Sequence, residues 1–321
     1  MAPDSIEYYS RDADYILREA LTNMKGLIDF LYFGGLEECS EEENARFHVK
    51  LKESSDTLYS LLNSNIIEKA NRIEKLNAII RMDLELASKI QHKILPDNSG
   101  TIGGMDFHVS FIPMMQVGGD IYDIAEIRPG CVRIFLADAT GHGVQTALIT
   151  MIIKSEYEML KNVIASPAEL LVTLNDMFTR VYSGLGMFFT CIIVDVDVRE
   201  KTMRYSSAGH PVQYLIRPSG EFVPLSHKGV LVGFREGYRY REDVMAVPDG
   251  GKLMLYSDGI YEEFNAVKDE YGEERLRSFL ERCTHRDVRD MVEAVVDDLM
   301  GFIGGKELSD DITMIGVELP K

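Results

Sequence analysis

Residues 135–143 read Phe135-Leu136-Ala137-Asp138-Ala139-Thr140-Gly141-His142-Gly143, an apolar run that ends on an aspartate and is followed by small residues. Three other segments share this design: Val117-Gly118-Gly119-Asp120, Leu253-Met254-Leu255-Tyr256-Ser257-Asp258-Gly259 and Asp310-Asp311-Ile312-Thr313-Met314. A carboxylate at the end of a buried strand lies partly in the core, where an unpaired charge is costly. Four such groups can be tolerated together when they surround cations. Carboxylate ligands without His or Cys select hard ions, so the pattern predicts a Mg²⁺ or Mn²⁺ site.

Each of these motifs taken alone is also typical of a turn. Glycine supplies a positive φ angle, and aspartate bonds to its own backbone. The metal-site interpretation is favoured by number, because all four motifs occur in one chain and each adjoins a β-type run.

Composition limits the class of protein. The 321 residues, 45% of them hydrophobic, allow a large core and predict two domains. A formal charge of −18 argues against nucleic-acid binding. The cysteines Cys39, Cys131, Cys191 and Cys283 show no metal-ligand spacing, which predicts reduced thiols. No apolar stretch approaches ~18 residues, and the acidic N-terminus is unlike a signal peptide. We therefore expect a cytoplasmic protein without a membrane span.

Residues 1–95 are predicted to form a helical regulatory and dimerisation region. A break is expected near Gly34-Gly35, and Ser40 with the acidic residues after it is a predicted N-cap of a helix that runs to Leu95. This helix carries two series of positions that recur every seven residues. The first series is Ile66, Ile73, Ile80, Ala87 and Ile94. The second, offset from it by four, is Leu62, Lys69, Leu76, Asp83 and Ile90. The pattern favours a short dimeric coiled coil, and a helix of a single-chain bundle remains the alternative.

Residues 96–321 are predicted to form an α+β domain. Pro96–Gly100 and Gly103-Gly104 end the helix, and short β-type runs follow, interrupted by a few helices. The predicted strands are Phe107–Ile112, Ile121–Ile127, Val132–Ala137, Phe188–Val196, Met203–Ser207, Gln213–Arg217, Tyr240–Val247, Leu253–Ser257 and Ile312–Glu318. The predicted helices are Val144–Val163, Pro167–Tyr182, Glu273–Cys283 and Arg286–Phe302.

These motifs resemble those of the bacterial metal-dependent protein phosphatases of the stage II sporulation E type, within the wider protein phosphatase 2C (PP2C) fold. The resemblance covers about residues 88 to 318 and adds Met187-Phe188-Phe189-Thr190 and Ala208-Gly209-His210-Pro211 to the motifs above. Ala87–Pro96 resembles the linker helix that precedes such domains. The resemblance implies a four-layer α-β-β-α sandwich with two Mn²⁺ or Mg²⁺ ions at one end.

The same resemblance implies the roles of individual residues. Asp138 would bridge the two ions, the Ala139 carbonyl would help to bind one, and Asp258 and Asp310 would complete the other. Asp120 would bind the second ion directly or through water. Asp310 is preferred over Asp311 as the ligand, and Asp138 and Asp120 are the predicted catalytic residues. The predicted phosphate loop is Gly141-His142-Gly143, where His142 either contacts phosphate or only shapes the loop, an ambiguity that also applies to His210.

The implied activity is hydrolysis of phosphoserine or phosphothreonine by a metal-activated water. By resemblance, the substrate would be a phosphorylated regulator such as an anti-sigma-factor antagonist, and the helical region would form a homodimer. The sequence lacks the arginine with which eukaryotic members hold phosphate. A catalytically inactive signalling scaffold remains the alternative. A nucleotide-cyclase interpretation of Gly118-Gly119-Asp120 is set aside, because Ile121 and Tyr122 follow where an acidic continuation is required.

Overall fold

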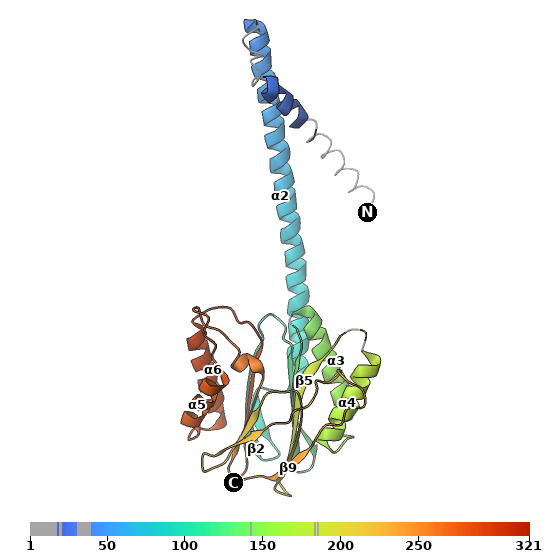
Figure 1. Cartoon of the computed structure of the whole chain (residues 1–321), viewed down its shortest axis with the longest axis vertical. Coiled ribbons are helices and arrows are strands. Elements are labelled where there is room, and N and C mark those ends of the chain that lie inside the picture. Colours follow the sequence, from blue (N-terminus) through green and yellow to red (C-terminus); the bar gives the residue numbers. More distant parts are fainter. Residues whose placement is uncertain (1–17, 19–20, 31–39, 142, 183, 185) are drawn as a thin grey trace. The chain divides into compact units, whose positions relative to one another are not determined.

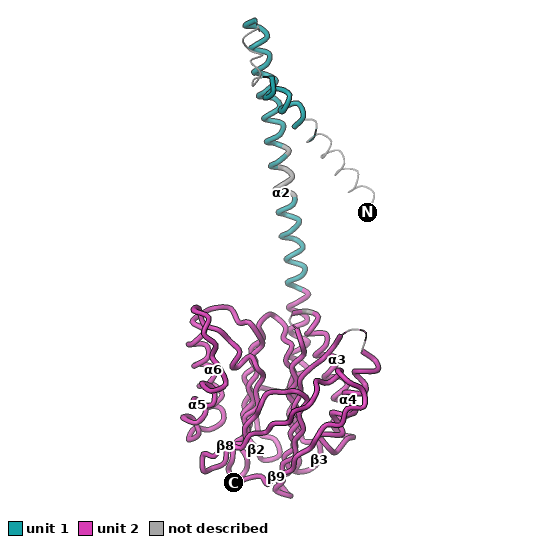
Figure 2. The backbone as a smooth tube through the Cα atoms, viewed as in Figure 1, with its two compact units in different colours: residues 1–82 teal, residues 83–321 magenta. Residues whose placement is uncertain are grey.

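The structure is a computed structural model that describes all residues except 1–17, 19–20, 31–39, 142, 183 and 185. The chain divides into two compact units, Met1–Met82 and Asp83–Lys321 (Figure 2). The boundary lies inside helix α2 (Glu41–Ile94), so the last three turns of this helix belong to the second unit. None of the helices in the described ranges combines the length and the apolarity that a bilayer crossing requires.

Helix α2 begins as predicted. The Glu43 amide donates to Ser40 Oγ at 3.3 Å, and the Ser40 amide donates to Glu43 Oε2 at 2.9 Å, which is a reciprocal capping box. The predicted break near Gly34-Gly35 lies outside the described residues. On α2, the seam residues Ile73, Leu76 and Ile80 are exposed.

The second unit contains two antiparallel sheets. Sheet A has the strand order β1 (Ser99–Ile102), β2 (Met105–Ile112), β11 (Ile312–Glu318), β10 (Lys252–Tyr256), β7 (Gln213–Ile216) and β8 (Phe222–Leu225). Sheet B has the order β3 (Asp120–Arg128), β4 (Cys131–Ala139), β5 (Phe189–Asp197), β6 (Thr202–Ala208) and β9 (Asp243–Ala246). Strand β11 lies between β2 and β10, so segments distant in sequence are neighbours in sheet A.

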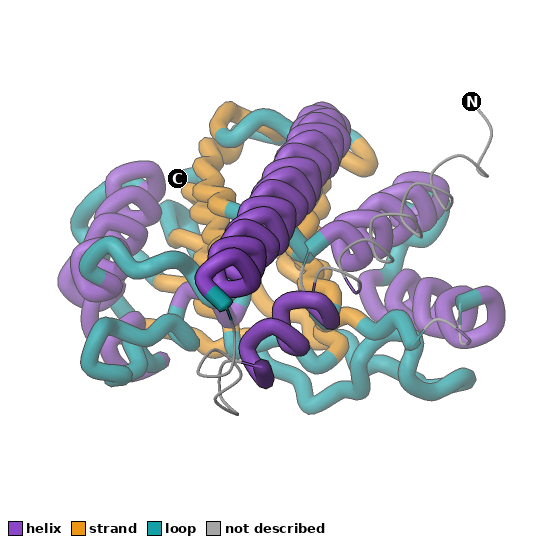
Figure 3. Tube along the Cα trace, turned by 90° about the horizontal axis from the view of Figure 1, so that it is seen from above, coloured by secondary structure: helices purple, strands orange, loops and turns teal. Residues whose placement is uncertain are grey.

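Two helix pairs cover the outer faces of the sheets. Helices α3 (Val144–Leu160) and α4 (Pro167–Val181) pack on sheet B, whereas α5 (Glu273–Cys283) and α6 (Val288–Ile303) lie on the sheet A side (Figure 1). Viewed along the perpendicular direction, the strands lie between the two pairs (Figure 3). This confirms the predicted four-layer α-β-β-α sandwich.

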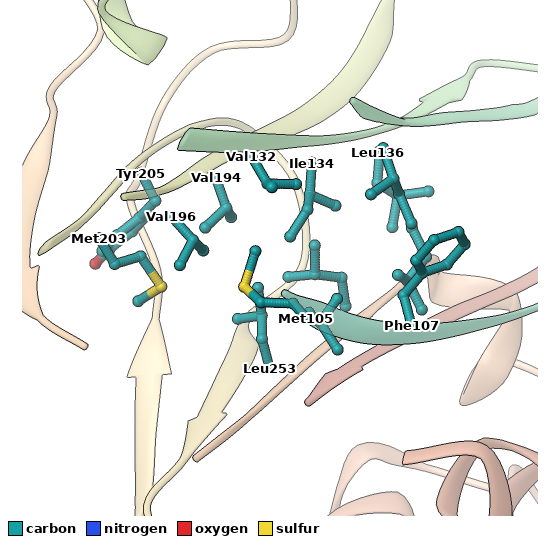
Figure 4. Close-up of a cluster of buried hydrophobic side chains, with 14 of the residues drawn as sticks. Met105, Phe107, Val132, Ile134, Leu136, Val194, Val196, Met203, Tyr205 and Leu253 are labelled. Atoms are coloured by element: carbon teal, nitrogen blue, oxygen red, sulfur yellow. The ribbon is translucent and has the colours of Figure 1, made fainter. Parts of the chain in front are cut away.

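Both faces of strand β4 are buried, which explains why its sequence is almost continuously apolar. Ile134 and Leu136 point into the core between the sheets, where they meet Met105 and Phe107 (Figure 4). Phe135, the residue between them, belongs to the separate core between sheet B and its helices. Because side chains alternate along a strand and both faces are covered, both sets of positions must be apolar.

Buried charges in this layer are paired. The fully buried Arg133 binds both Asp195 oxygens at 2.6 Å and also donates to the carbonyls of Lys161, Ile164 and Ala165, which follow α3. Asp123 is buried and pairs with Lys154 and Lys161 at 2.5 and 3.0 Å. A buried charge is tolerated only with such partners. These ion pairs are therefore structural.

Two strands were missed by the prediction. β1 lies in Ser99–Ile102, where proline and glycines predicted a break, and β8 at Phe222–Leu225 contains Pro224. Both are the edge strands of sheet A, and edge positions tolerate glycine and proline because one side needs no ladder partner. The predicted strand Tyr240–Val247 is shorter in the structure, Asp243–Ala246.

Candidate metal centre

One end of sheet B places two of the predicted site residues opposite each other. Asp120 is the first residue of β3 and pairs in register with Asp138 near the end of β4. The Ala139 amide donates to the Gly119 carbonyl at 3.0 Å and extends this pairing past Asp120. The antiparallel register therefore juxtaposes two carboxylates that are 18 positions apart.

The matching end of sheet A contributes the other acids. The Ser257 amide donates to the Thr313 carbonyl at 3.0 Å, and the Thr313 amide donates to Ser257 Oγ at 3.1 Å. These bonds join the end of β10 to the start of β11. As a result, Asp258, which begins a 3₁₀ turn at 258–260, lies beside the segment that carries Asp310 and Asp311.

Side chains then connect the two sheets. Thr313 Oγ1 donates to Asp120 Oδ2 at 2.5 Å. The Asp311 carboxylate accepts hydrogen bonds from the Met114 amide, at 2.6 Å, and from the Gly119 amide. The structure thus brings all five predicted carboxylates, Asp120, Asp138, Asp258, Asp310 and Asp311, to one end of the sandwich.

The glycines beside these acids permit close approach and do not form positive-φ turns. A Cβ atom on Gly259 would lie 2.1 Å from the Asp311 carbonyl oxygen, and one on Gly119 would lie 2.6 Å from the Thr146 side chain. Neither glycine has a positive φ angle. Gly259 does lie in the 3₁₀ turn at 258–260, but each of the two glycines is needed because two segments pass within contact distance, and a positive φ angle is not the reason.

The carboxylates disfavour one another's ionised forms. Burial is the largest cause of a raised pKa in each of the five, and neighbouring acids add to it for Asp120, Asp138 and Asp310. Burial, followed by the other four acids, raises the pKa of Asp138 to about 10, and burial with Asp258 raises that of Asp310 to about 6. None of the described residues donates a hydrogen bond to the Asp138 carboxylate. Such mutual repulsion is relieved when a cation binds.

The donor set fits hard divalent ions, since it consists of carboxylate oxygens. Within the described residues, however, no three acidic, His or Cys side chains enclose a common point as a closed ligand shell. Hydrogen bonds hold several of the oxygens: Asp120 binds Thr313, and Asp311 binds two backbone amides. Among the described residues, only the amide of Asp311, its neighbour in sequence, donates to the carboxylate of the half-buried Asp310. The ligand roles of individual residues remain predictions.

The glycine loop that follows Asp138 leads into α3. Gly141 and Gly143 have φ angles of 105° and 86°, and Gly143, which occupies the N-cap position, has no side chain with which to cap the helix. Amide groups in an uncapped first turn are available to an anion. His142 lies outside the described residues. His210 is buried next to Thr190, with its Nδ1 2.7 Å from Thr190 Oγ1, and Thr190 pairs with Asp138 across β4 and β5. Burial lowers the pKa of His210 to about 3, against a smaller opposing effect of the Tyr256 backbone, so its ring is neutral.

Gln91 on α2 was missed by the sequence analysis. Its side chain is 2% exposed and binds both backbone groups of Gly118: the Gly118 amide donates to Oε1 at 3.0 Å, and Nε2 donates to the Gly118 carbonyl at 2.8 Å. Nε2 also lies 3.3 Å from Thr150 Oγ1 on α3. Gln91 thereby joins the last turn of α2 to the loop before Asp120. A lone glutamine on an otherwise amphipathic helix carries no signal from which this contact could be predicted.

A match to a protein-family model identifies the family of this chain. The model for stage II sporulation protein E (SpoIIE) matches residues 128–320. The chain belongs to the SpoIIE family. The matched range includes Asp138, Asp258, Asp310 and Asp311 but begins after Asp120. As a SpoIIE member with the PP2C fold, the chain is a protein serine/threonine phosphatase.

Individual relatives share about a quarter of their residues or fewer with this chain. Phosphoserine phosphatase RsbU of Bacillus subtilis is 25% identical over 240 residues, which cover 74% of this chain and 70% of RsbU. The chain spans about half the length of two other curated relatives, protein IcfG of Synechocystis sp. and phosphoserine phosphatase RsbP of Bacillus subtilis. Among solved structures, the SiaA-PP2C domain of Pseudomonas aeruginosa has a TM-score of 0.68 at 23% identity and covers 76% of this chain and 98% of that domain. RsbX, solved in complex with magnesium, has a TM-score of 0.50 at 17% identity, with coverages of 70% and 97%.

Proposed function

We propose that this SpoIIE-family phosphatase hydrolyses phosphoserine or phosphothreonine on a regulatory protein and uses two Mn²⁺ or Mg²⁺ ions. The observation that carries the proposal is the gathering of five acids from two sheets at one end of the sandwich, where burial raises the pKa of each. The magnesium complex of the structural neighbour RsbX supports the choice of ion.

In this proposal, Asp138, Asp120, Asp258, Asp310 and the Ala139 carbonyl would hold the ions. The ions would supply Lewis-acid polarisation of the phosphoryl oxygens and acidification of a bound water. Thr313 orients Asp120 through its hydroxyl, and Asp311 holds the loop that precedes Asp120 through two backbone amides. The start of α3, where the N-cap residue is Gly143, would face the phosphate.

The substrate class is inferred from the relatives. RsbU and RsbP are named as phosphoserine phosphatases. We propose that the substrate of this chain is likewise a phosphorylated regulator, of the anti-sigma-factor antagonist type. An inactive signalling scaffold is disfavoured because none of the five predicted acids is replaced.

Metal-dependent turnover tests this function. The purified 321-residue chain should hydrolyse p-nitrophenyl phosphate and a phosphoserine peptide in Mn²⁺, and chelation should abolish both activities. The substitution Asp138→Asn should lower kcat by at least about 1,000-fold, because the residue proposed to hold both ions loses its charge. Metal-independent turnover, or full activity of Asp138→Asn, would reject the proposal, and an inactive wild type that binds a partner through α2 would support the scaffold.

We also propose that α2 regulates the site as part of a homodimer. Exposed Ile73, Leu76 and Ile80 support pairing along the seam, and the contact of Gln91 with Gly118 is a physical connection from the same helix to the metal loop. Truncation before Ser88 should therefore change the activity or its Mn²⁺ dependence, measured with p-nitrophenyl phosphate. Unchanged kinetics and regulation would eliminate the regulatory role.

A further inference from the structure

A cleft of about 640 Å³ opens beside the carboxylate cluster and is lined by residues from two segments, Glu262, Phe264 and Lys268 and then Lys306, Ser309 and Asp310. The end of the cleft that carries Glu262 and Asp310 adjoins the candidate metal centre. The nearby charge of Asp258 contributes to the raised pKa of both acids. Apart from Asp310, the lining residues have no role in the proposed hydrolysis.

The first of these segments is a rigid hairpin. The Asn265 side-chain oxygen accepts from the amides of Val267 and Asp269 at 3.0 and 2.9 Å, and the Asn265 amide donates to the Asp269 carbonyl at 3.0 Å. Lys268 adopts a φ angle of 67°, which is uncommon for a residue other than glycine. Local hydrogen bonds therefore fix the backbone from which the Lys268 side chain projects.

The second segment is fastened to the first. Fully buried Glu263 accepts from the Ser309 amide at 2.6 Å, the Ser309 hydroxyl at 2.8 Å and the Asp310 amide at 3.2 Å. Lys306 Nζ lies 3.4 Å from the Phe264 carbonyl across the cleft. These contacts couple the geometry of the cleft to that of Asp310.

The cleft also carries free positive charge. Among the described residues, neither Lys268 nor Lys306 forms an ion pair with a carboxylate, although the chain has a formal charge of −18. An acidic chain repels anionic ligands at long range, so local cations near the site decide where such a ligand can approach. Phe264, which is 39% exposed and belongs to the same segment as Lys268, adds an apolar surface to the lining of the cleft.

We propose that this cleft binds the part of the substrate that flanks the phosphorylated serine, with acidic side chains on Lys268 and Lys306. The inference rests on the proposed phosphatase function and specifies its preference for acidic sequence around the phosphoserine. The position of Asp310 in the wall places the flanking residues next to the metal centre while the phosphate enters it.

Two peptides of equal length test this preference: one phosphoserine peptide with flanking glutamates and its analogue with flanking glutamines. Wild-type enzyme should favour the glutamate peptide in kcat/KM by about three- to tenfold, the range expected from two exposed charge pairs. The double variant Lys268→Gln and Lys306→Gln should reduce that ratio to about one. Lys201→Gln is the matched control, because Lys201 also has a positive φ angle, 51°, and lies in the turn between β5 and β6.

A wild-type ratio near one, or equal loss of preference in Lys201→Gln, would overturn the inference. Fluorescence anisotropy of both labelled peptides with the Asp138→Asn variant in Mn²⁺ gives a readout that does not require turnover. There, Lys268→Gln and Lys306→Gln should weaken binding of the glutamate peptide about three- to tenfold and leave the glutamine peptide unchanged. If wild type failed to hydrolyse p-nitrophenyl phosphate, the proposed function would fail, whereas anisotropy would still decide whether the cleft selects acidic peptides.

Discussion

Asp310 and Asp311 are neighbours in sequence but have different surroundings. Asp311 is buried and binds the Met114 and Gly119 amides, so its carboxylate stabilises the loop before Asp120. Asp310 is half-buried, and its pKa is raised by burial and then by Asp258. We therefore propose Asp310 as the metal ligand, as the family resemblance implies, and a positioning role for Asp311.

Two asparagine variants separate these roles. Asp310→Asn should weaken Mn²⁺ binding by at least about tenfold. Substitution of a residue that only hydrogen-bonds to a metal ligand already has an effect of that size. Asp311→Asn should instead lower the free energy of unfolding by about 1–3 kcal/mol, because hydrogen bonds to a charged acceptor are weakened. Calorimetric titration with Mn²⁺ and thermal unfolding measure the two effects. The reverse pattern would assign the ligand role to Asp311.

Metal binding should depend on pH in a defined direction. The folded pKa of Asp310 is about 6, above its ordinary value of 3.8. Between these values the unfolded carboxyl ionises while the folded one stays protonated, so this group's contribution to the stability of metal-free protein falls as pH rises. Mn²⁺ must displace the proton, hence its affinity should rise from pH 5 to 7 with proton release. Titration calorimetry in buffers of different ionisation enthalpy checks this, and a pH-independent affinity would contradict it.

At the level of elements, sheet pairing and one helix contact assemble the site. The β3–β4 register juxtaposes Asp120 and Asp138, whereas the β10–β11 pairing places Asp258 beside Asp310. Helix α2 reaches the first pair through Gln91, whose amide group matches the donor and acceptor of the Gly118 peptide. The predicted helix α2 and most of the predicted strands are confirmed. Periodicity, however, does not indicate which strands pair with each other.

Gln91→Ala should disturb the metal loop. The substitution leaves the buried amide and carbonyl of Gly118 without partners, at a cost of about 1–3 kcal/mol for each unsatisfied group. We expect weaker activation by Mn²⁺, measured as a higher Mn²⁺ concentration for half-maximal hydrolysis of p-nitrophenyl phosphate. Lys93→Ala on the same turn is the control, because Lys93 is exposed. An unchanged Mn²⁺ requirement in Gln91→Ala would show that α2 does not influence the loop.

At the scale of the whole molecule, the chain combines a catalytic unit with a helical one. The boundary at Asp83 falls inside α2, so the last turns of this helix, which carry Gln91, belong to the catalytic unit. The described cysteines, Cys131, Cys191 and Cys283, are free and buried, and Cys39 lies outside the described residues.

Disruption of the seam tests the proposed dimer. Ile80→Asp introduces a charge at a position that a coiled coil would bury, and it should raise the dimer dissociation constant by about 100-fold or more. Ala78→Asp places the same charge off both seam series and should leave the dimer intact. Sedimentation velocity across a concentration series distinguishes the outcomes. A wild type that remains monomeric would favour the single-chain helix bundle.

The amino-acid sequence alone determined the elements of this protein and the chemistry of its site. Hydrophobic periodicity specifies local structure, so the α2 capping box, all strands except the edge strands β1 and β8, and the five acids could be located without coordinates. Only the tertiary structure decided which groups meet: Thr313 with Asp120, Asp311 with the Gly119 amide, Gln91 with Gly118 and Lys306 with Phe264. These contacts join positions 27 to 193 residues apart or cross between layers, and a one-dimensional pattern carries no information about such separations.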